Sequence, residues 1–290
     1  MGKQKDTLDD VTFVFPVRVD CEERQANLQA VLSILIKETD SQFIILEADQ
    51  KPKLNLSFKT DRIKSIYIED KNPVFHRTKY LNQLLLHAQT PIVGLWDTDV
   101  ILQVSQIKEA CNYIRDNQAV MSFPYNGCFL TTNAIIADEF RKKPNYEIFR
   151  YAHPLYGNFA TGGAFLVDRK KYLEAGGENE NFYGWGPEDA ERVKRMEILE
   201  LPITRAKGNL YHLYHPRGKN SYFFDEKRRI QNLKELLKIC AMNKNELLDY
   251  IATWGGIITA HTRGNVVRFI CYLLFDLQNQ LICDTTFFLF

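Results

Sequence analysis

The chain has 290 residues, of which 45% are hydrophobic and 25% are charged, and its 37 basic and 36 acidic residues leave a formal net charge of +1. This length suffices for one large domain or two modest ones. The balanced charge lacks the basic excess that favours binding to nucleic acid, so we expect no nucleic-acid partner. The six cysteines are scattered without a CxxC pair. We therefore expect free thiols in a reducing compartment, and neither a disulfide framework nor a structural zinc site.

Apolar runs and helical spacings alternate along the first half of the chain. Short runs rich in β-branched and aromatic residues predict strands over residues 11–16, 42–48, 63–68, 91–97 and 119–124. Apolar residues at helical spacing predict helices over residues 22–37, 77–88 and 106–116. Strands that alternate with helices are typical of an α/β domain with a mainly parallel central sheet flanked by helices.

The second half of the chain has a different pattern. Residues 158–177 contain two Gly-Gly pairs around a short predicted strand and helix. Pro187 is well placed to begin another helix. Helices are also predicted over 225–240 and 243–254, the second with a capping box. In the segment from Val266, apolar residues recur at helical spacing, which predicts a helix that packs on the body or on a partner; a membrane-surface helix is the alternative.

Asp97 and Asp99 follow the apolar run that predicts the strand at 91–97. A buried carboxylate without a partner is costly, so these charges need a metal ion, a basic side chain or exposure. Ligands of parallel sheets bind at the carboxyl ends of the strands, and we therefore expect both aspartates to enter a cleft. Two aspartates spaced in this way are, by themselves, also compatible with a solvated turn.

Two further groups of residues can supply chemistry. His212 and His215 can converge on one ion if their segment is helical or turns, although single histidines in aromatic segments are often hydrogen-bonded core residues. Glu188 and Asp189 follow a glycine-rich loop in "GWGPEDAE" (184–191). They are candidates for acid–base chemistry, or simply an acidic helix start that the helix dipole favours.

Arg77 and Lys79 lie at the start of the predicted helix in "FHRTKYLN" (75–82). Basic residues at such a position can clamp phosphates. A solvated basic helix face is the alternative.

Taken in chain order, these segments resemble GT-A glycosyltransferases, and within them the animal β-1,4-galactosyltransferases and the bacterial chondroitin-polymerase-type galactosyl and N-acetylgalactosaminyl transferases. The resemblance covers about residues 11 to 225. It is carried by "FPVR" (15–18), "FHRTKYLN" (75–82), "WDTDV" (96–100), "TGGAFLVDRKKYLEAGG" (161–177), "YGWGPEDAE" (183–191) and "HLYHPRGKN" (212–220).

The resemblance implies a division of the chain. A GT-A domain is expected over residues 1–225, with a donor half at about 11–125 and an acceptor and catalytic half at about 150–225. A helical C-terminal extension is expected over 226–290.

Site residues are also implied by the resemblance, position by position. The expected catalytic residues are Asp189, as the base, and its neighbour Glu188. The expected donor-binding residues are Pro16, Arg18, Arg77, Asp97 and Trp185. The expected acceptor-binding residues are Tyr183, Trp185, Glu188, Gly162 and Gly163. The expected metal-binding residues are Asp97, Asp99, His212 and His215.

The implied activity is a metal-dependent, inverting transfer of galactose or N-acetylgalactosamine from a UDP-sugar to a hydroxyl of a glycan acceptor, in the synthesis of a surface polysaccharide or glycoconjugate. Carboxylate ligands suit Mn²⁺ or Mg²⁺, and the imidazoles favour Mn²⁺. A retaining glycosyltransferase, a nucleotidyltransferase, and a non-catalytic module that binds glycans or nucleotides are the alternatives. Related retaining enzymes have an asparagine where Asp189 stands.

Three features depart from the family pattern. Pro187 replaces a glycine that is usual in the loop that moves over the donor, which puts the mobility of this loop in question. The N-terminus, "MGKQKDTLDD", lacks the secretory anchor of the animal enzymes, so we expect a cytoplasmic protein. The segment beyond Trp254 has no counterpart in the family; a contact of this tail with a partner or with the inner face of the membrane is a candidate role.

Overall fold

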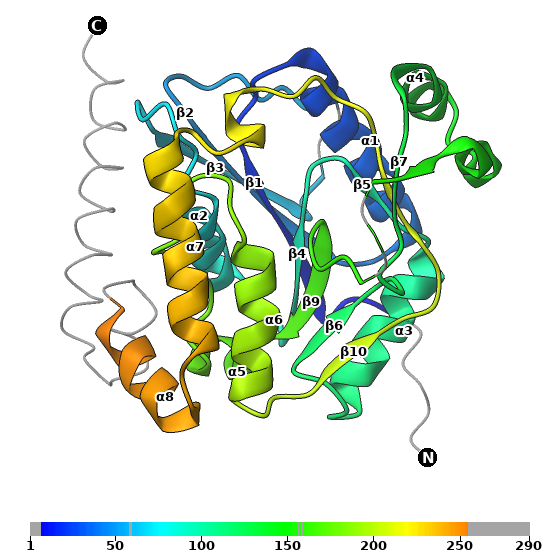
Figure 1. The fold of residues 1–290 in the computed structure, drawn as a ribbon. Coiled ribbons are helices and arrows are strands. Elements are labelled where there is room, and N and C mark those ends of the chain that lie inside the picture. The colour runs from blue at the N-terminus through cyan, green and yellow to red at the C-terminus, as the bar shows by residue number, and fades with distance from the viewer. Residues whose placement is uncertain (1–6, 58–59, 156, 158, 255–290) are drawn as a thin grey trace, which may run out of the picture.

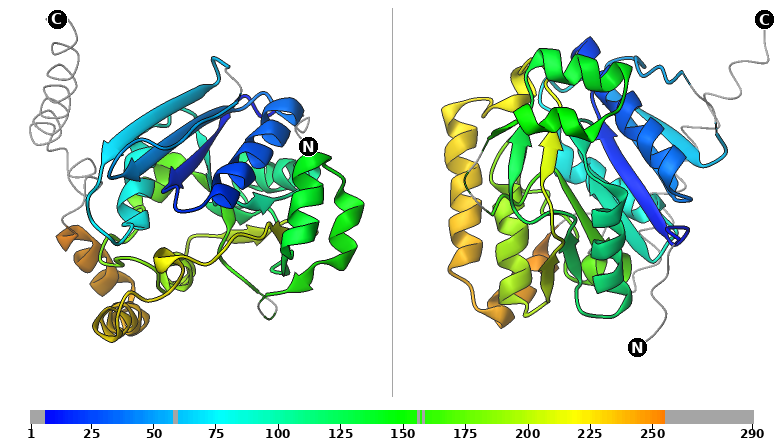
Figure 2. Two further views of the ribbon diagram at one scale, coloured as in Figure 1. Left: turned by 90° about the horizontal axis from the view of Figure 1, so that it is seen from above. Right: turned by 90° about the vertical axis from the view of Figure 1, so that its right-hand side faces the viewer.

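The computed structural model describes residues 7–57, 60–155, 157 and 159–254. A central sheet of seven strands has helices on both sides (Figures 1 and 2). Its strands, from one edge to the other, are β10 (Ile203–Arg205), β6 (Met121–Phe123), β9 (Ala164–Asp168), β4 (Ile92–Trp96), β1 (Val11–Val17), β2 (Gln42–Asp49) and β3 (Ile63–Glu69).

The sheet is mainly parallel, as expected. The pairs β1–β2, β1–β4, β2–β3 and β6–β10 are parallel. Only β9 runs antiparallel, between β4 and β6. Its register sets Ala164 opposite Trp96, and the peptide N–H of Asp97 donates to the carbonyl of Gly163 at 2.8 Å. This pairing brings the Gly162–Gly163 segment beside the two aspartates.

The helices form where apolar side chains recur at helical spacing. They are α1 (Glu22–Glu38), α2 (Arg77–His87), α3 (Val104–Arg115), α4 (Ala134–Lys142), α5 (Arg169–Glu174), α6 (Glu188–Ile198), α7 (Glu226–Cys240) and α8 (Lys244–Thr253), with the 3₁₀ segments η1 (Tyr146–Tyr151) and η2 (Lys219–Ser221). Asn243 forms the expected capping box with Glu246 at the start of α8. The expected strands and helices before residue 125 are all present within a few residues of their predicted ends.

A second, smaller sheet was not predicted. Its strands are β5 (Val100–Ile101), β11 (Leu210–His212), β7 (Phe129–Thr131) and β8 (His153–Pro154), in that order. Strands of two or three residues are too short to give a periodic signal. This sheet matters for the site because β11 pairs with β5 and sets His212 opposite Val100, beside Asp99.

The C-terminal helices pack on the body of the domain. Helix α7 lies against α6, and α8 also contacts α6 (Figure 1). The proposed division at residues 225 and 226 stays a prediction. Among the described residues, no helix is long and apolar enough to cross a membrane. The expected tail helix from Val266 lies outside the described residues.

Candidate active site

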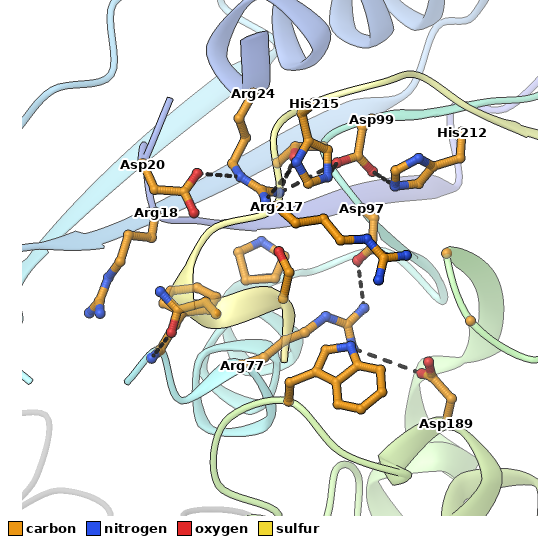
Figure 3. A pocket seen from close by; sticks show the side chains of 18 of the residues that line it. Arg18, Asp20, Arg24, Arg77, Asp97, Asp99, Asp189, His212, His215 and Arg217 are labelled. Carbon is orange, nitrogen blue, oxygen red and sulfur yellow. Dashed lines mark hydrogen bonds and ion pairs between the residues drawn. The ribbon is translucent and has the colours of Figure 1, made fainter. Parts of the chain in front are cut away.

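The expected metal ligands Asp99, His212 and His215 come together at the carboxyl end of β4. Strand β4 ends at Trp96, and Asp99 lies in the short connection to β5. Nε2 of His212 lies 3.3 Å from Oδ1 of Asp99, and Nε2 of His215 lies 3.2 Å from Oδ2 (Figure 3). One ligand atom from each of the three residues can be chosen so that all three lie within 4.8 Å of one another.

The hydrogen bonding of this group fits a divalent cation. Nδ1 of His215 lies 2.8 Å from the carbonyl oxygen of Pro216, and because a carbonyl can only accept, this contact assigns the ring proton to Nδ1. Nε2 is then the nitrogen that can bind a metal ion, once it loses the proton that it shares with Asp99. Metal-binding histidines are commonly oriented in this way by a backbone carbonyl. A buried carboxylate together with imidazole lone pairs is a donor set that suits Mn²⁺.

The charged groups near Asp99 favour the ionised form of its carboxyl group. Burial raises the pKa of Asp99, but His212, His215 and Arg24 outweigh it and hold this pKa below its usual range. For His212, burial lowers the pKa. For His215, burial also acts to lower the pKa, but the bond to Asp99 outweighs it and the net shift is upward.

Asp97 and the expected base Asp189 lie on either side of Arg77 (Figure 3). Nη2 of Arg77 donates to Oδ1 of Asp97 at 2.7 Å, and Nη1 lies 4.0 Å from Oδ1 of Asp189. Nη1 of Arg77 is buried without a hydrogen-bond partner among the described residues. This donor is therefore available to an anionic ligand, which is the role expected of an arginine that contacts a diphosphate.

Asp189 is oriented from the protein interior. Nη1 of Arg192 donates to its Oδ1 at 2.7 Å. Arg192 is itself fully buried and makes two bonds to Glu178, at 3.0 and 2.7 Å. The other oxygen, Oδ2, faces Gly162: a Cβ atom at position 162 would lie 2.6 Å from it. Only glycine allows this approach, and Oδ2 is the oxygen that can accept a proton from a substrate.

Glu188 lies beside Asp189 but in a different environment. It is 7% exposed, and its Oε2 is buried without a hydrogen-bond partner among the described residues. Burial and then the charge of Asp189 raise the pKa of Glu188 to about 8. The two adjacent carboxyl groups therefore differ: Asp189 is bound by arginine, and Glu188 favours the protonated acid at neutral pH.

One pocket contains most of the residues expected from the sequence. They are Pro16, Arg18, Arg77, Asp97, Asp99, Gly162, Gly163, Trp185, Glu188, Asp189, His212 and His215. Arg18 lies at its edge and points away from the aspartates (Figure 3), where it donates to Asp70 and to the carbonyls of Ala48 and Asn72. Tyr183 is not among the lining residues, because its ring contacts His76 and Arg228 instead.

The sequence analysis missed several residues of this pocket. Arg24 lies at the start of α1. Its Nη1 lies 3.4 Å from Oδ2 of Asp99, and its Nε donates to Oδ1 of Asp20 at 2.8 Å. Arg217 and Asn220 line the pocket from the segment after His215. No local pattern in the sequence indicates Arg24, whereas Arg217 could have been found by its place beside the histidine pair.

A family model and a curated relative match part of the chain. Residues 145–216 match the family described as the N-terminal domain of galactosyltransferase. Beta-1,4-galactosyltransferase 4 of Mus musculus is 32% identical over 63 residues, which are 21% of this chain and 18% of that enzyme. The matched segment includes Trp185, Asp189, His212 and His215. The resemblance to galactosyltransferases is thus confirmed for this part of the chain.

One of the solved structures similar to this chain shares its fold by TM-score. GalNAc-T7 with UDP, GalNAc and Mn²⁺ is similar with a TM-score of 0.54 and 13% identity, over 86% of this chain and 50% of that chain. The catalytic domain of Drosophila beta1,4galactosyltransferase 7 with xylobiose gives a TM-score of 0.44 and 17% identity, over 68% of this chain and 64% of that chain. The expected GT-A fold is confirmed. The chain spans less than two thirds of each of these proteins.

Proposed function

We propose that this protein is a metal-dependent, inverting glycosyltransferase that moves galactose or N-acetylgalactosamine from a UDP-sugar to a hydroxyl of a glycan acceptor. One observation carries the proposal: a candidate metal group, an arginine whose Nη1 has no hydrogen-bond partner among the described residues, and a carboxylate whose Oδ2 faces Gly162 all line the same pocket. The match to galactosyltransferases over residues 145–216 supports the same reaction class.

The donor side of the site is formed by Arg77 and the aspartates. Asp99, His212 and His215, with Asp97 nearby, would hold Mn²⁺ or Mg²⁺, and such an ion neutralises the charge that develops on a departing diphosphate. Arg77 supplies a second positive charge, because its Nη1 has no hydrogen-bond partner among the described residues. Pro16 and Arg18 line the same pocket, where the nucleotide would bind.

The acceptor side is formed by Asp189, Glu188 and Gly162. Oδ2 of Asp189 accepts the proton of the acceptor hydroxyl, whose oxygen then attacks the anomeric carbon as the UDP leaves. The bond between Oδ1 and Arg192 fixes the direction of this base. A protonated Glu188 can donate to a second oxygen of the acceptor. A single base without a separate nucleophile gives one displacement, and therefore inversion.

A panel of UDP-sugars tests this function. UDP release is measured with Mn²⁺, with and without glycan acceptors, and the anomeric configuration of the product is read by NMR. Release that depends on an acceptor, with an inverted product, is expected. Retention would favour the retaining alternative, and UDP binding without any release would favour a binding module. The cytoplasmic location and the surface polysaccharide or glycoconjugate as product stay proposals, based on the sequence and its resemblance.

A further inference from the structure

Helix α7 presents a stripe of polar side chains to the loop that precedes α6. Arg228, Asn232 and Glu235 are spaced four and three residues apart, so they lie on one face of the helix. All three contact residues between Asn179 and Gly186. This loop contains Trp185, which lines the pocket.

The central contact of this stripe is Asn232. Its side chain is 1% exposed, and its Nδ2 donates to the carbonyl oxygen of Trp185 at 3.3 Å and, more weakly, to that of Tyr183 at 3.5 Å. The backbone of Gly186 passes close to it: a Cβ atom at position 186 would lie 2.5 Å from Nδ2 of Asn232. Helix and loop therefore fit each other through a glycine and a buried amide.

The ends of the stripe hold the two sides of the loop. The guanidinium of Arg228 lies 4.4 Å from the centre of the Tyr183 ring. Oε1 of Glu235 accepts from Nδ2 of Asn179 at 2.8 Å and from Nδ2 of Asn181 at 3.2 Å. Few of these contacts are apolar, so they fix the path of the loop through directed bonds and add little hydrophobic burial.

We propose that α7 holds the loop at residues 179–186 in its conformation, which we call its template role. We further propose that Asn232 is a positioning residue that orients Trp185 toward the acceptor. The proposal rests on the proposed transferase function for its acceptor role, and on geometry alone for the shape of the loop. Asn232 lies outside the segment that matches galactosyltransferases, residues 145–216. Acceptor selection would then depend on a helix beyond that segment.

The main test compares Asn232→Leu, which removes both donors and keeps the branching of the side chain, with Gln231→Leu at the neighbouring exposed position of α7. Amide hydrogen exchange of residues 183–186 should quicken about tenfold in Asn232→Leu, the effect of losing about one hydrogen bond. The KM for the acceptor should rise by a similar factor, and by more than the KM for the UDP-sugar. Gln231→Leu should behave as the unaltered protein does.

Acrylamide quenching gives a readout that needs no activity. Trp96 and Trp254 are 1% and 8% exposed, whereas Trp185 is 42% exposed, so quenching of tryptophan fluorescence reports mainly on Trp185. Quenching should increase in Asn232→Leu. If exchange and quenching match those of Gln231→Leu, the template role is overturned, whether or not transfer is detected. If the loop loosens while the acceptor KM stays constant, the acceptor role is overturned.

A double-mutant cycle covers the case in which Asn232→Leu does not fold. Gly186→Ala adds a methyl group against Nδ2, and Asn232→Ala removes that obstacle. We expect each single variant to lower the melting temperature, and the double variant to lose less than the sum of the two. Additive losses would show that the two positions do not touch and would overturn the proposal.

Discussion

Asp189 and Arg192 lie one turn apart in α6, and Oδ1 of Asp189 accepts a hydrogen bond from Nη1 of Arg192 at 2.7 Å. Because Glu178 holds the same arginine through two bonds, the guanidinium is fixed before any substrate binds. Arg192 therefore fixes the orientation of the Asp189 carboxylate, and Oδ2 stays directed at Gly162 and the pocket.

Asp189→Asn removes the base and keeps its size. The amide oxygen can still accept from Arg192, and Glu178 still neutralises that arginine, so the fold should be preserved. If Asp189 takes the proton, kcat should fall by roughly 10²–10⁴-fold, the usual range for general acid–base catalysis. Steady-state UDP release measures the rate, and calorimetry should show UDP binding in Mn²⁺ unchanged. Near-normal turnover with an intact fold would remove Asp189 from its catalytic role.

Gly162→Ala tests the role of Oδ2, the oxygen of the same carboxylate that faces Gly162. A Cβ atom at 2.6 Å from Oδ2 must displace Asp189, and a base displaced by a few tenths of an ångström loses its alignment with the acceptor hydroxyl. We expect kcat to fall at least tenfold while UDP affinity is kept. Gly157→Ala is the matched control, because a Cβ atom there meets nothing within 4 Å. Equal rates for the two variants would contradict this arrangement.

The metal group is tested by thermal unfolding. A ligand that binds only the folded state stabilises it by about 2.7 kcal/mol at a hundredfold excess over its Kd. Mn²⁺ should raise the melting temperature of the protein, and EDTA should reverse the increase. Asp99→Asn and His215→Ala should abolish the shift. His153→Ala, at an exposed histidine in β8, should keep it. A shift that survives in Asp99→Asn would place the ion elsewhere.

Donor binding should be visible at Trp185. This side chain is 42% exposed and lines the same pocket as Asp97 and Asp99. UDP-sugar with Mn²⁺ should cover it and reduce acrylamide quenching of its fluorescence, and the reduction should disappear in EDTA, because the aspartates and the donor phosphates would repel one another. Unchanged quenching at saturating donor would place the sugar nucleotide away from this loop.

The sequence predicts most of the central sheet because strands such as β1 and β2 are long, apolar and separated by helices with a clear period. The three-residue edge strand β10 was not predicted. The end of β4 was foreseen from the change of apolar residues to Asp97 and Asp99, and both lie at the pocket. The convergence of His212 and His215 could be stated only as a condition, that their segment is helical or turns. In the structure, the pairing of β11 with β5 sets His212 beside Asp99, and His215 follows after the end of β11. Strands of that length leave no periodic signal.

Long-range contacts explain what the sequence did not predict. Arg24 reaches Asp99 from a helix 75 residues earlier in the chain, and no local pattern indicates such a partner. Asn232 in α7 reads as one polar residue among many on an amphipathic helix. Its role depends on Gly186, a residue that is close to it only in the folded chain.

The last prediction concerns pH and Glu188. Burial and the charge of Asp189 raise the pKa of this carboxyl from 4.5 to about 8, so between these values the folded protein binds more protons than the unfolded chain. The contribution of Glu188 to stability should then fall as the pH rises from about 4.5 to 8, because the slope follows the difference in bound protons. Glu188→Gln has no proton to lose and should flatten this part of the profile.

Urea midpoints measured in EDTA at several pH values test this. Glu197→Gln, at an exposed residue of α6 that pairs with Lys194, is the matched control and should leave the slope unchanged. A profile that Glu188→Gln does not alter would show that Glu188 is ionised in the folded protein and cannot donate a proton to the acceptor.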